Sequence, residues 1–178
     1  MLLLTFTAGS NRHAVDAARV VELVPRVALR AVPHAPEHLA GLLSYRGHVV
    51  PVIDLGLLLG AGPCRDRLAT RIILVDAARN LDHSAKPGMA VAAERQDSAP
   101  KRRIVGLIAE EVSDLLSIRP EQAAPSPVIL SRAPYLGPIV QTERGEIVQI
   151  LLVDALESAA LESSEEHEPA ALIKEPRA

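Results

Sequence analysis

Short apolar runs, separated by residues that favour turns, recur along most of the chain. Runs of about four to eight residues that are rich in Val, Ile and Leu, and are bounded by Gly, Pro, Asn or Asp, are typical of β-strands. The pattern therefore predicts strands over residues 2–6, 20–24, 42–46, 49–53, 71–75, 103–109 and 146–153. Such a regular succession of short strands and turns predicts a mainly β protein, built as a barrel or a sandwich.

Between these strands, helical signals are confined to short segments. Asp16 can cap a single turn over residues 17–20, and Asp54 can cap the turn that follows its own strand. Pro36 suits the first position of a further short helix, and Gly41 suits its end. Asp54 also stands at the end of an apolar strand, where catalytic carboxylates often lie, but the capping role is the simpler interpretation.

The stretch GLLSYRGHVVPVIDLG, residues 41–56, has the pattern of a β-hairpin. The predicted strands before and after Gly47 and His48 form its two arms. Glycine permits the positive φ that tight turns need, so Gly41 and Gly47 are assigned to the turns of this hairpin. Pro51 cannot donate a ladder hydrogen bond, which predicts that its strand lies at a sheet edge or carries a bulge.

Two charged residues interrupt this apolar pattern. Glu22 lies inside the predicted strand 20–24, and Arg46 ends the first arm of the hairpin. Strand alternation places Val20, Glu22 and Val24 on one face. An unpaired charge in an apolar setting is costly, so the favourable arrangement is for Glu22 to pair with Arg46. The pair either stabilises the fold alone or also contacts a partner.

The bulk composition narrows the class of protein. The chain has 178 residues, which fits one domain or two small subdomains, and only 2% of its residues are aromatic. A net charge of -3 and a pI of about 6.1 argue against a nucleic-acid-binding protein, because such proteins need an excess of basic residues to contact phosphates. Cys64 is the only cysteine, so we expect an inert thiol and no disulfide. No apolar run is long enough to span a membrane and no signal-peptide pattern opens the chain, so we expect a cytoplasmic protein.

The residue patterns of common catalytic and cofactor sites are missing. The sequence has no glycine-rich phosphate loop, no Gly-x-Ser-x-Gly and no His-Glu-x-x-His. His34 and His38 are four residues apart, but Pro36 separates them and no third ligand follows at metal-site spacing. We therefore expect no catalytic residue, cofactor or metal, and a protein that works by binding. An enzyme and a nucleic-acid-binding barrel are the weaker alternatives.

Several blocks of sequence, taken together, resemble one known family. In chain order they are LLLTF, VVELVP, VPHAPEHLAGLLSYRGHVVPVIDL, TRIILV, VGLIAEEVSDLLSIRPEQ and YLGPIVQTERGEIVQILLVDAL. They resemble the CheW family of bacterial chemotaxis coupling proteins over residues 2–156, with 78–103 unmatched. The resemblance implies two small five-stranded, SH3-like β-barrels that share an apolar core, with short helices. It implies a CheW-like domain over 1–156, which includes a segment at about 78–103 that its composition identifies as a polar insertion. The composition of residues 157–178 predicts an acidic, partly helical or disordered tail.

The resemblance also implies a function. Members of this family are non-catalytic adaptors that couple the cytoplasmic tip of methyl-accepting chemoreceptors to the regulatory domain of a CheA-type histidine kinase. Such an adaptor is cytoplasmic and is recruited to membrane receptor arrays, without inserting into the membrane or binding nucleic acid. The alternative is a coupling protein of a specialised non-flagellar array, for surface sensing with a diguanylate cyclase output.

The resemblance assigns a role to the charged pair. In the family, the residues that match Glu22 and Arg46 pair beside a groove that takes the helical tip of a receptor, and the residue that matches Val20 lies in that groove. It therefore implies that Val20, Glu22 and Arg46 bind a receptor. Ser44 and Tyr45 depart from the family pattern, which usually has asparagine and leucine at these positions.

Overall fold

The computed structural model describes residues 1–77, 103–127 and 131–162. The described chain is mainly β, as the sequence predicted, with only short helices between the strands. The elements, in chain order, are β1 (Leu2–Ala8), β2 (Asn11–Asp16), η1 (Ala17–Arg19), β3 (Val20–Pro25), β4 (Leu39–Tyr45), β5 (His48–Asp54), α1 (Leu55–Leu58), β6 (Arg71–Asp76), β7 (Ile104–Ser117), η2 (Pro120–Gln122), β8 (Ala123–Ala124), β9 (Leu136–Gln141), β10 (Ile147–Leu151) and α2 (Val153–Glu162).

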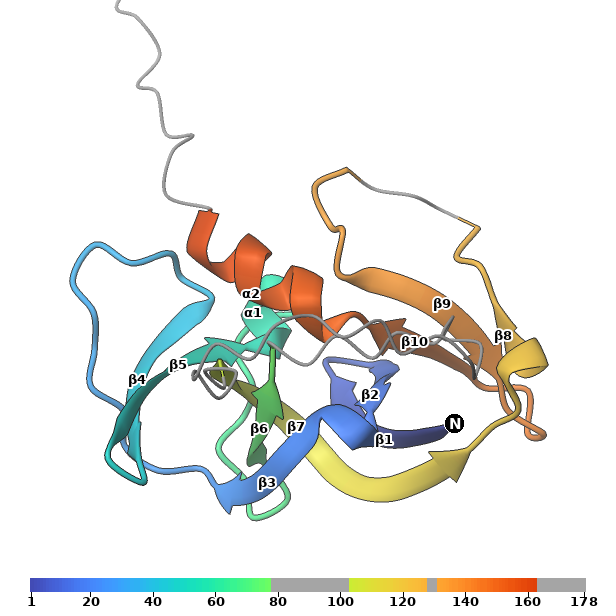
Figure 1. Ribbon diagram of the computed structural model, residues 1–178, viewed down its shortest axis with the longest axis horizontal. Helices are drawn as coiled ribbons and strands as arrows, with labels where there is room; N and C mark the ends of the chain where they lie inside the picture. The colour runs from blue at the N-terminus through green and yellow to red at the C-terminus, as the bar shows by residue number, and fades with distance from the viewer. Residues whose placement is uncertain (78–102, 128–130, 163–178) are drawn as a thin grey trace, which may run out of the picture.

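The strands form two halves that share the long strand β7 (Figure 1). In one half the order is β3-β6-β7-β5-β4, and in the other it is β7-β1-β2-β10-β9-β8. This arrangement is compatible with the two SH3-like subdomains that the resemblance implied. The sheet does not close into a barrel, however, because no ladder joins β3 to β4 at the two ends of the first half. Beyond the end of β3, Arg30 forms only an isolated bridge with Leu42 of β4.

A bulge allows β7 to serve both halves. Its first part pairs with β6 as far as Ala109, and its second part pairs with β1. The β1 register shifts between Thr5 and Thr7, opposite Glu111, whose φ of 49° lies in the left-handed region. Because a β-bulge bends its strand and increases the local twist, β7 can leave one half of the sheet and enter the other.

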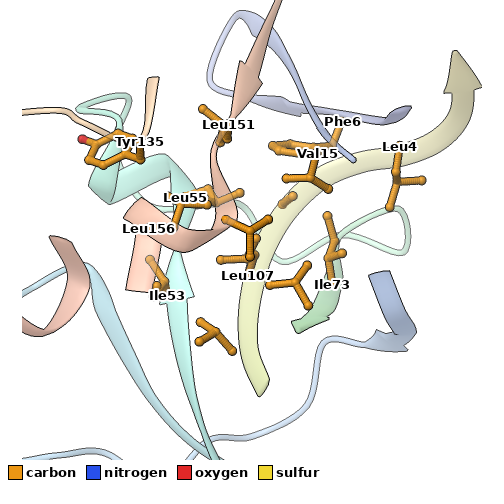
Figure 2. Close-up of a cluster of buried hydrophobic side chains, with 14 of the residues drawn as sticks. Leu4, Phe6, Val15, Ile53, Leu55, Ile73, Leu107, Tyr135, Leu151 and Leu156 are labelled. Atoms are coloured by element: carbon orange, nitrogen blue, oxygen red, sulfur yellow. The ribbon is translucent and has the colours of Figure 1, made fainter. Parts of the chain in front are cut away.

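The largest apolar cluster lies between the two halves (Figure 2). It combines side chains from both halves with residues of α1 and α2. Its fully buried large members are Phe6, Ile53, Leu55, Ile73, Leu107, Leu151, Leu156 and Val15. Truncating one such leucine to alanine typically costs about 2–5 kcal/mol of folding free energy. The shared apolar core is therefore what fixes the two halves to one another.

The short helix predicted from Pro36 to Gly41 does not form. Residues 37–38 make a turn, β4 begins at Leu39, and Gly41 lies within that strand opposite Val52. A segment this short forms too few helical hydrogen bonds to offset the free-energy cost of helix nucleation. As a strand, residues 39–45 instead pair with β5 along their length. Gly41 is therefore not a hairpin-turn residue. Glycine is needed there because φ is 143° and an added Cβ would lie 2.6 Å from the carbonyl oxygen of Arg30.

The hairpin turn itself is shifted by one residue from the prediction. Tyr45 and His48 form the last pair of the β4–β5 ladder, so the two-residue turn is Arg46-Gly47. Their φ values of 48° and 80° are both positive, as the favoured two-residue hairpin turns require. Arg46 therefore projects from the tip of the hairpin and not from a strand face. Pro51 precedes the part of β5 that pairs with β7, so its strand is paired on one side only at that position.

The two peripheral segments named from the sequence lie largely outside the described residues. Of the insertion, residues 78–102 are not described, but the backbone N–H of Ala77 donates to the carbonyl oxygen of Arg103 at 2.7 Å. The two ends of the insertion are therefore adjacent. Of the tail, residues 157–162 continue α2, and residues 163–178 are not described.

Candidate functional site

Glu22 on β3 and Arg46 in the β4–β5 turn form an ion pair. Arg46 Nη2 lies 2.8 Å from Glu22 Oε2. The two side chains are nevertheless exposed, 73% for Arg46 and 40% for Glu22. The sequence interpretation, in which an apolar setting forces the pairing, is therefore wrong about the setting. Because Arg46 lies at the hairpin tip, its guanidinium reaches Glu22 from the solvent side.

Tyr45 completes this site, although sequence reasoning noted it only as a departure from the family pattern. Its hydroxyl donates to the same Oε2 atom of Glu22, at 2.5 Å. The guanidinium carbon of Arg46 lies over the Tyr45 ring, 5.1 Å from its centroid, which is a favourable cation–π geometry. Each of the three side chains therefore contacts the other two.

The three residues lie where the first half of the sheet is open. β3 is hydrogen-bonded to β6, and β4 to β5, whereas no ladder joins β3 to β4. The backbone groups of Arg30 and Leu42 bond to one another at 3.0 and 2.8 Å, and the side chains of Glu22, Tyr45 and Arg46 provide a second link across the same opening. The site is thus a polar connection between two edge strands.

Val20 is on the same strand as Glu22 but in a different environment. It is half-buried and packs against the large cluster between the two halves, whereas Val21 and Val24 pack against the core of the first half. The β3 register shifts between Val20 and Glu22, so the alternation expected over these residues is interrupted. The structure brings Glu22 and Arg46 into contact and leaves Val20 at the start of the strand.

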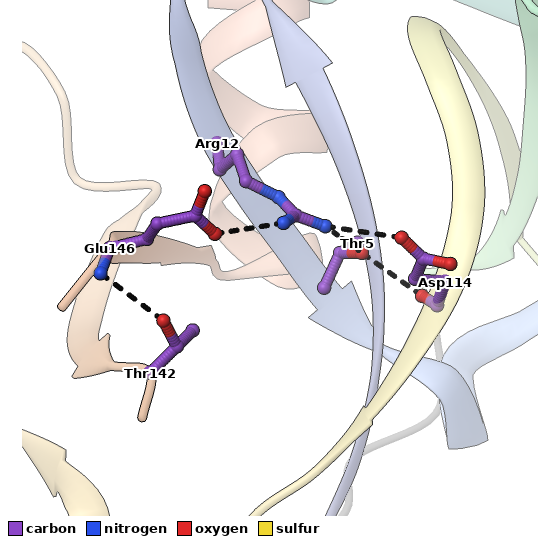
Figure 3. A network of polar contacts seen from close by, with 5 residues as sticks. All are labelled: Thr5, Arg12, Asp114, Thr142 and Glu146. Carbon is purple, nitrogen blue, oxygen red and sulfur yellow. Dashed lines mark hydrogen bonds and ion pairs between the residues drawn. The ribbon is translucent and has the colours of Figure 1, made fainter. Parts of the chain in front are cut away.

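A second polar surface lies on the other half (Figure 3). Arg12 on β2 bonds to Glu146 at 2.9 Å and to Asp114 on β7 at 3.4 Å, and it also donates to the hydroxyl of Thr5 at 3.2 Å. Thr142 accepts a hydrogen bond from the backbone N–H of Glu146. This network borders a cleft of about 390 Å³, whose apolar lining is Leu115, Leu116, Ile118, Val140 and Val148.

Three side chains of types common in catalytic sites are held in unreactive settings. Asp54 caps α1, accepting hydrogen bonds from the backbone of Gly56 and Leu57, so the capping interpretation is confirmed. Burial, with a further contribution from Asp54, raises the pKa of the Cys64 thiol to about 12, so almost no nucleophilic thiolate exists at neutral pH. Burial lowers the pKa of His13 to about 4.

The described residues also bear on metal binding and membrane crossing. Within residues 1–77, 103–127 and 131–162, no group of three or more His, Cys, Asp or Glu side chains could hold a metal ion. In the same part of the chain, no helix is both long enough and apolar enough to cross a membrane.

Comparison with known proteins places the chain in a family. A model described as a CheW-like domain matches residues 2–160. The chain belongs to the CheW-like domain family. A probable chemotaxis protein CheW from Rhizobium etli is 30% identical to this CheW-like chain over 129 residues, which cover 72% of the chain and 68% of the relative. A chemotaxis protein CheW from Klebsiella aerogenes is 24% identical over 124 residues, covering 70% of the chain and 61% of that protein.

A solved structure supports the same fold. The scaffolding protein TtCheW from Thermoanaerobacter tengcongensis superposes with a TM-score of 0.66 at 22% identity, covering 85% of this chain and 83% of the other. Proteins of the CheW family are non-catalytic scaffolds, so this chain is a chemotaxis-type scaffold and not an enzyme.

Proposed function

We propose that this CheW-like chain couples methyl-accepting chemoreceptors to the regulatory domain of a CheA-type histidine kinase. It acts in the cytoplasm, at the membrane-associated receptor array, by binding both partners at once. The observation that carries the proposal is the exposed cluster of Glu22, Tyr45 and Arg46, because charged and aromatic side chains held in one geometry at a surface are typical of binding sites.

The receptor contact is assigned to Glu22 and Arg46, together with Val20 at the start of β3, the strand that carries Glu22. The ion pair is exposed, so each side chain can reach a partner without unfolding of the strand. The paired side chains also hold each other in place, which lowers the entropy lost when a partner binds. Val20 contributes apolar surface at the start of the same strand.

A pull-down tests this assignment. The immobilised chain is offered the cytoplasmic fragment of a chemoreceptor and, separately, the kinase regulatory domain, both from the same genome. We expect wild type to retain both, and Arg46→Ala to lose the receptor fragment and keep the kinase domain. Arg12→Ala is the matched control, because it also removes a guanidinium from an ion pair, but on the other half of the molecule. Retention of neither partner by wild type would reject the proposed function.

A separate variant tests the apolar part of the proposed receptor contact, which is the side chain of Val20. Val20→Ala removes apolar side-chain surface at the start of β3 without leaving a charge unpaired, so it should weaken receptor binding and spare kinase binding. If a folded Val20→Ala protein bound the receptor fragment as tightly as wild type, the receptor site would lie elsewhere.

A further inference from the structure

The two donors that hold Glu22 both use one of its oxygens. The hydroxyl of Tyr45 and Nη2 of Arg46 donate to Oε2, at 2.5 and 2.8 Å. Among the residues that the structure describes, none donates to Oε1 of Glu22. A carboxylate can accept about four hydrogen bonds, so this second oxygen keeps its full capacity for a partner.

Arg46 retains hydrogen-bond donors that complement the free acceptor oxygen of Glu22. A guanidinium has five N–H donors, and the bond to Glu22 uses one of the two Nη groups. With the side chain 73% exposed, the remaining donors face solvent. An acceptor on Glu22 and donors on Arg46 therefore lie next to one another, fixed by their contact through Oε2.

The charges of the site select the kind of group that fits it. Glu22 and Arg46 neutralise each other, so an anion drawn to Arg46 would also meet Glu22, and a cation drawn to Glu22 would also meet Arg46. A neutral group with one donor and one acceptor side by side satisfies both residues without this repulsion. The primary carboxamide of Asn or Gln has this pattern, since its oxygen accepts and its nitrogen donates two hydrogen bonds.

We propose that Glu22 and Arg46 recognise the carboxamide side chain of an Asn or Gln on the receptor, and that Tyr45 is the positioning residue of this site. The inference rests on the proposed receptor-binding function and adds the chemistry of the contact. The carboxamide oxygen accepts from Arg46, and its nitrogen donates to Oε1 of Glu22.

Tyr45 acts through the other two residues. Its ring packs against the apolar core of the first half, and this packing limits the movement of the ring and of the hydroxyl that it carries. The hydroxyl fixes Oε2 of Glu22, and the ring face supports the guanidinium of Arg46. Without the hydroxyl, the carboxylate loses one of its two donors, and its plane can tilt away from the orientation that presents Oε1 beside the free donors of Arg46, which lowers the fraction of molecules ready to bind.

Exchange of the two charges distinguishes a carboxamide from a charged partner group. A carboxamide can turn by half a rotation about its terminal bond and exchange its donor and acceptor, whereas a charged group cannot. The dissociation constant for the receptor fragment that wild type binds is measured for Glu22→Arg, for Arg46→Glu and for the double exchange. We expect each single reversal to weaken binding at least about thirtyfold and the double exchange to restore it to within about fivefold of wild type.

The positioning role has a separate variant and a matched control. Tyr45→Phe keeps the ring and removes the hydroxyl, so the dissociation constant should rise about fivefold. Tyr135→Phe also removes a phenol hydroxyl, one that donates to the backbone of Leu58 away from this site, and it should leave receptor affinity unchanged. The thermal midpoint and the affinity for the kinase domain are measured for every variant to establish that it is folded.

The outcomes separate this inference from the proposed function. A folded double exchange that binds as poorly as the single reversals would overturn the carboxamide assignment, and an unchanged affinity for Tyr45→Phe would overturn the positioning role. Both results would leave the coupling function intact. If the double exchange does not fold, the salt dependence of wild-type binding decides: a neutral partner group predicts little change between about 0.05 and 0.5 M salt, and a steep loss of affinity contradicts it.

Discussion

The guanidinium of Arg19 binds the carboxylate of Asp154, and this contact links the end of η1, directly before β3, to the first turn of α2. Arg19 is only 5% exposed, although it is charged. It also donates to the backbone carbonyl oxygens of Asp76, at 2.8 Å, and Ala77, at 3.2 Å. One buried side chain therefore joins η1, the end of β6 and α2.

Arg19 is expected to contribute more to stability than its partner does. Arg19→Ala leaves two carbonyl groups without their donor and opens a cavity, so it should lower the free energy of unfolding by about 2–4 kcal/mol. Asp154→Ala should lower it less, because the guanidinium keeps its two backbone acceptors and water can reach the exposed side of the pair. Urea denaturation of both variants measures the difference. Equal losses, or a larger loss for Asp154→Ala, would contradict this account.

His13 should make the fold sensitive to acid. Burial lowers its pKa from about 6.5 to about 4, and its Nδ1 atom has no hydrogen-bond partner among the described residues. Because the folded-state pKa is the lower one, the unfolded chain binds the extra proton between these values. The stability linked to His13 is therefore complete above about pH 6.5 and decreases as the pH falls towards 4, by about 3 kcal/mol in all.

A variant isolates this effect from the carboxylates, which also titrate in acid. His13→Leu removes the imidazole and keeps an apolar side chain beside the ring of Phe6. Wild type should lose more stability than His13→Leu between pH 6.5 and pH 4.5, as measured by urea denaturation at each pH. Parallel pH dependences for the two proteins would show that His13 is not the source.

The insertion should be dispensable for folding. The hydrogen bond between Ala77 and Arg103 means that a very short connection can replace residues 78–102. Closing a shorter loop costs slightly less entropy, and the ladder between β6 and β7 stays intact. A chain with about four Gly and Ser residues in place of 78–102 should melt within a few degrees of wild type by circular dichroism. Loss of the cooperative transition would mean that the replaced segment contributes to the core.

The pair of Glu22 and Arg46 should contribute little to stability, in contrast to Arg19. Both side chains are exposed, and exposed ion pairs are typically worth about 0.2–1 kcal/mol. A double-mutant cycle on Glu22→Ala and Arg46→Ala should therefore give a coupling energy in this range. A coupling above about 2 kcal/mol would indicate a buried pair, and additive losses would indicate that the two residues do not interact.

Local sequence patterns were enough to predict many individual elements. The apolar run at 71–75 became β6 (Arg71–Asp76), and Asp54 caps the turn that follows its strand. Both depend on neighbours in the sequence, such as the alternation of side chains or the first free N–H groups of a helix. The pairing of Glu22 with Arg46 was also anticipated, because each is a lone charge in an apolar context.

Features that depend on distant contacts were missed. β2 (Asn11–Asp16) begins with polar residues and is a strand only because β1 and β10 pair with both of its edges. The turn position of Arg46 follows from the β4–β5 register, and the sequence interpretation placed this turn one residue too late in the chain. The hydroxyl contact of Tyr45 with Glu22 depends on how β3 and β4 face one another across the open end of the sheet, and no local pattern encodes that distance.

The most direct test of the coupling function is the activity of the kinase in a reconstituted array. Autophosphorylation of the CheA-type kinase is measured with receptor-containing membranes, in the presence and absence of this chain. The account predicts that the receptors control kinase activity only when the chain is present, that Arg46→Glu abolishes this control, and that Arg12→Ala preserves it. Receptor control of the kinase that is equally strong without the chain would contradict the proposed function.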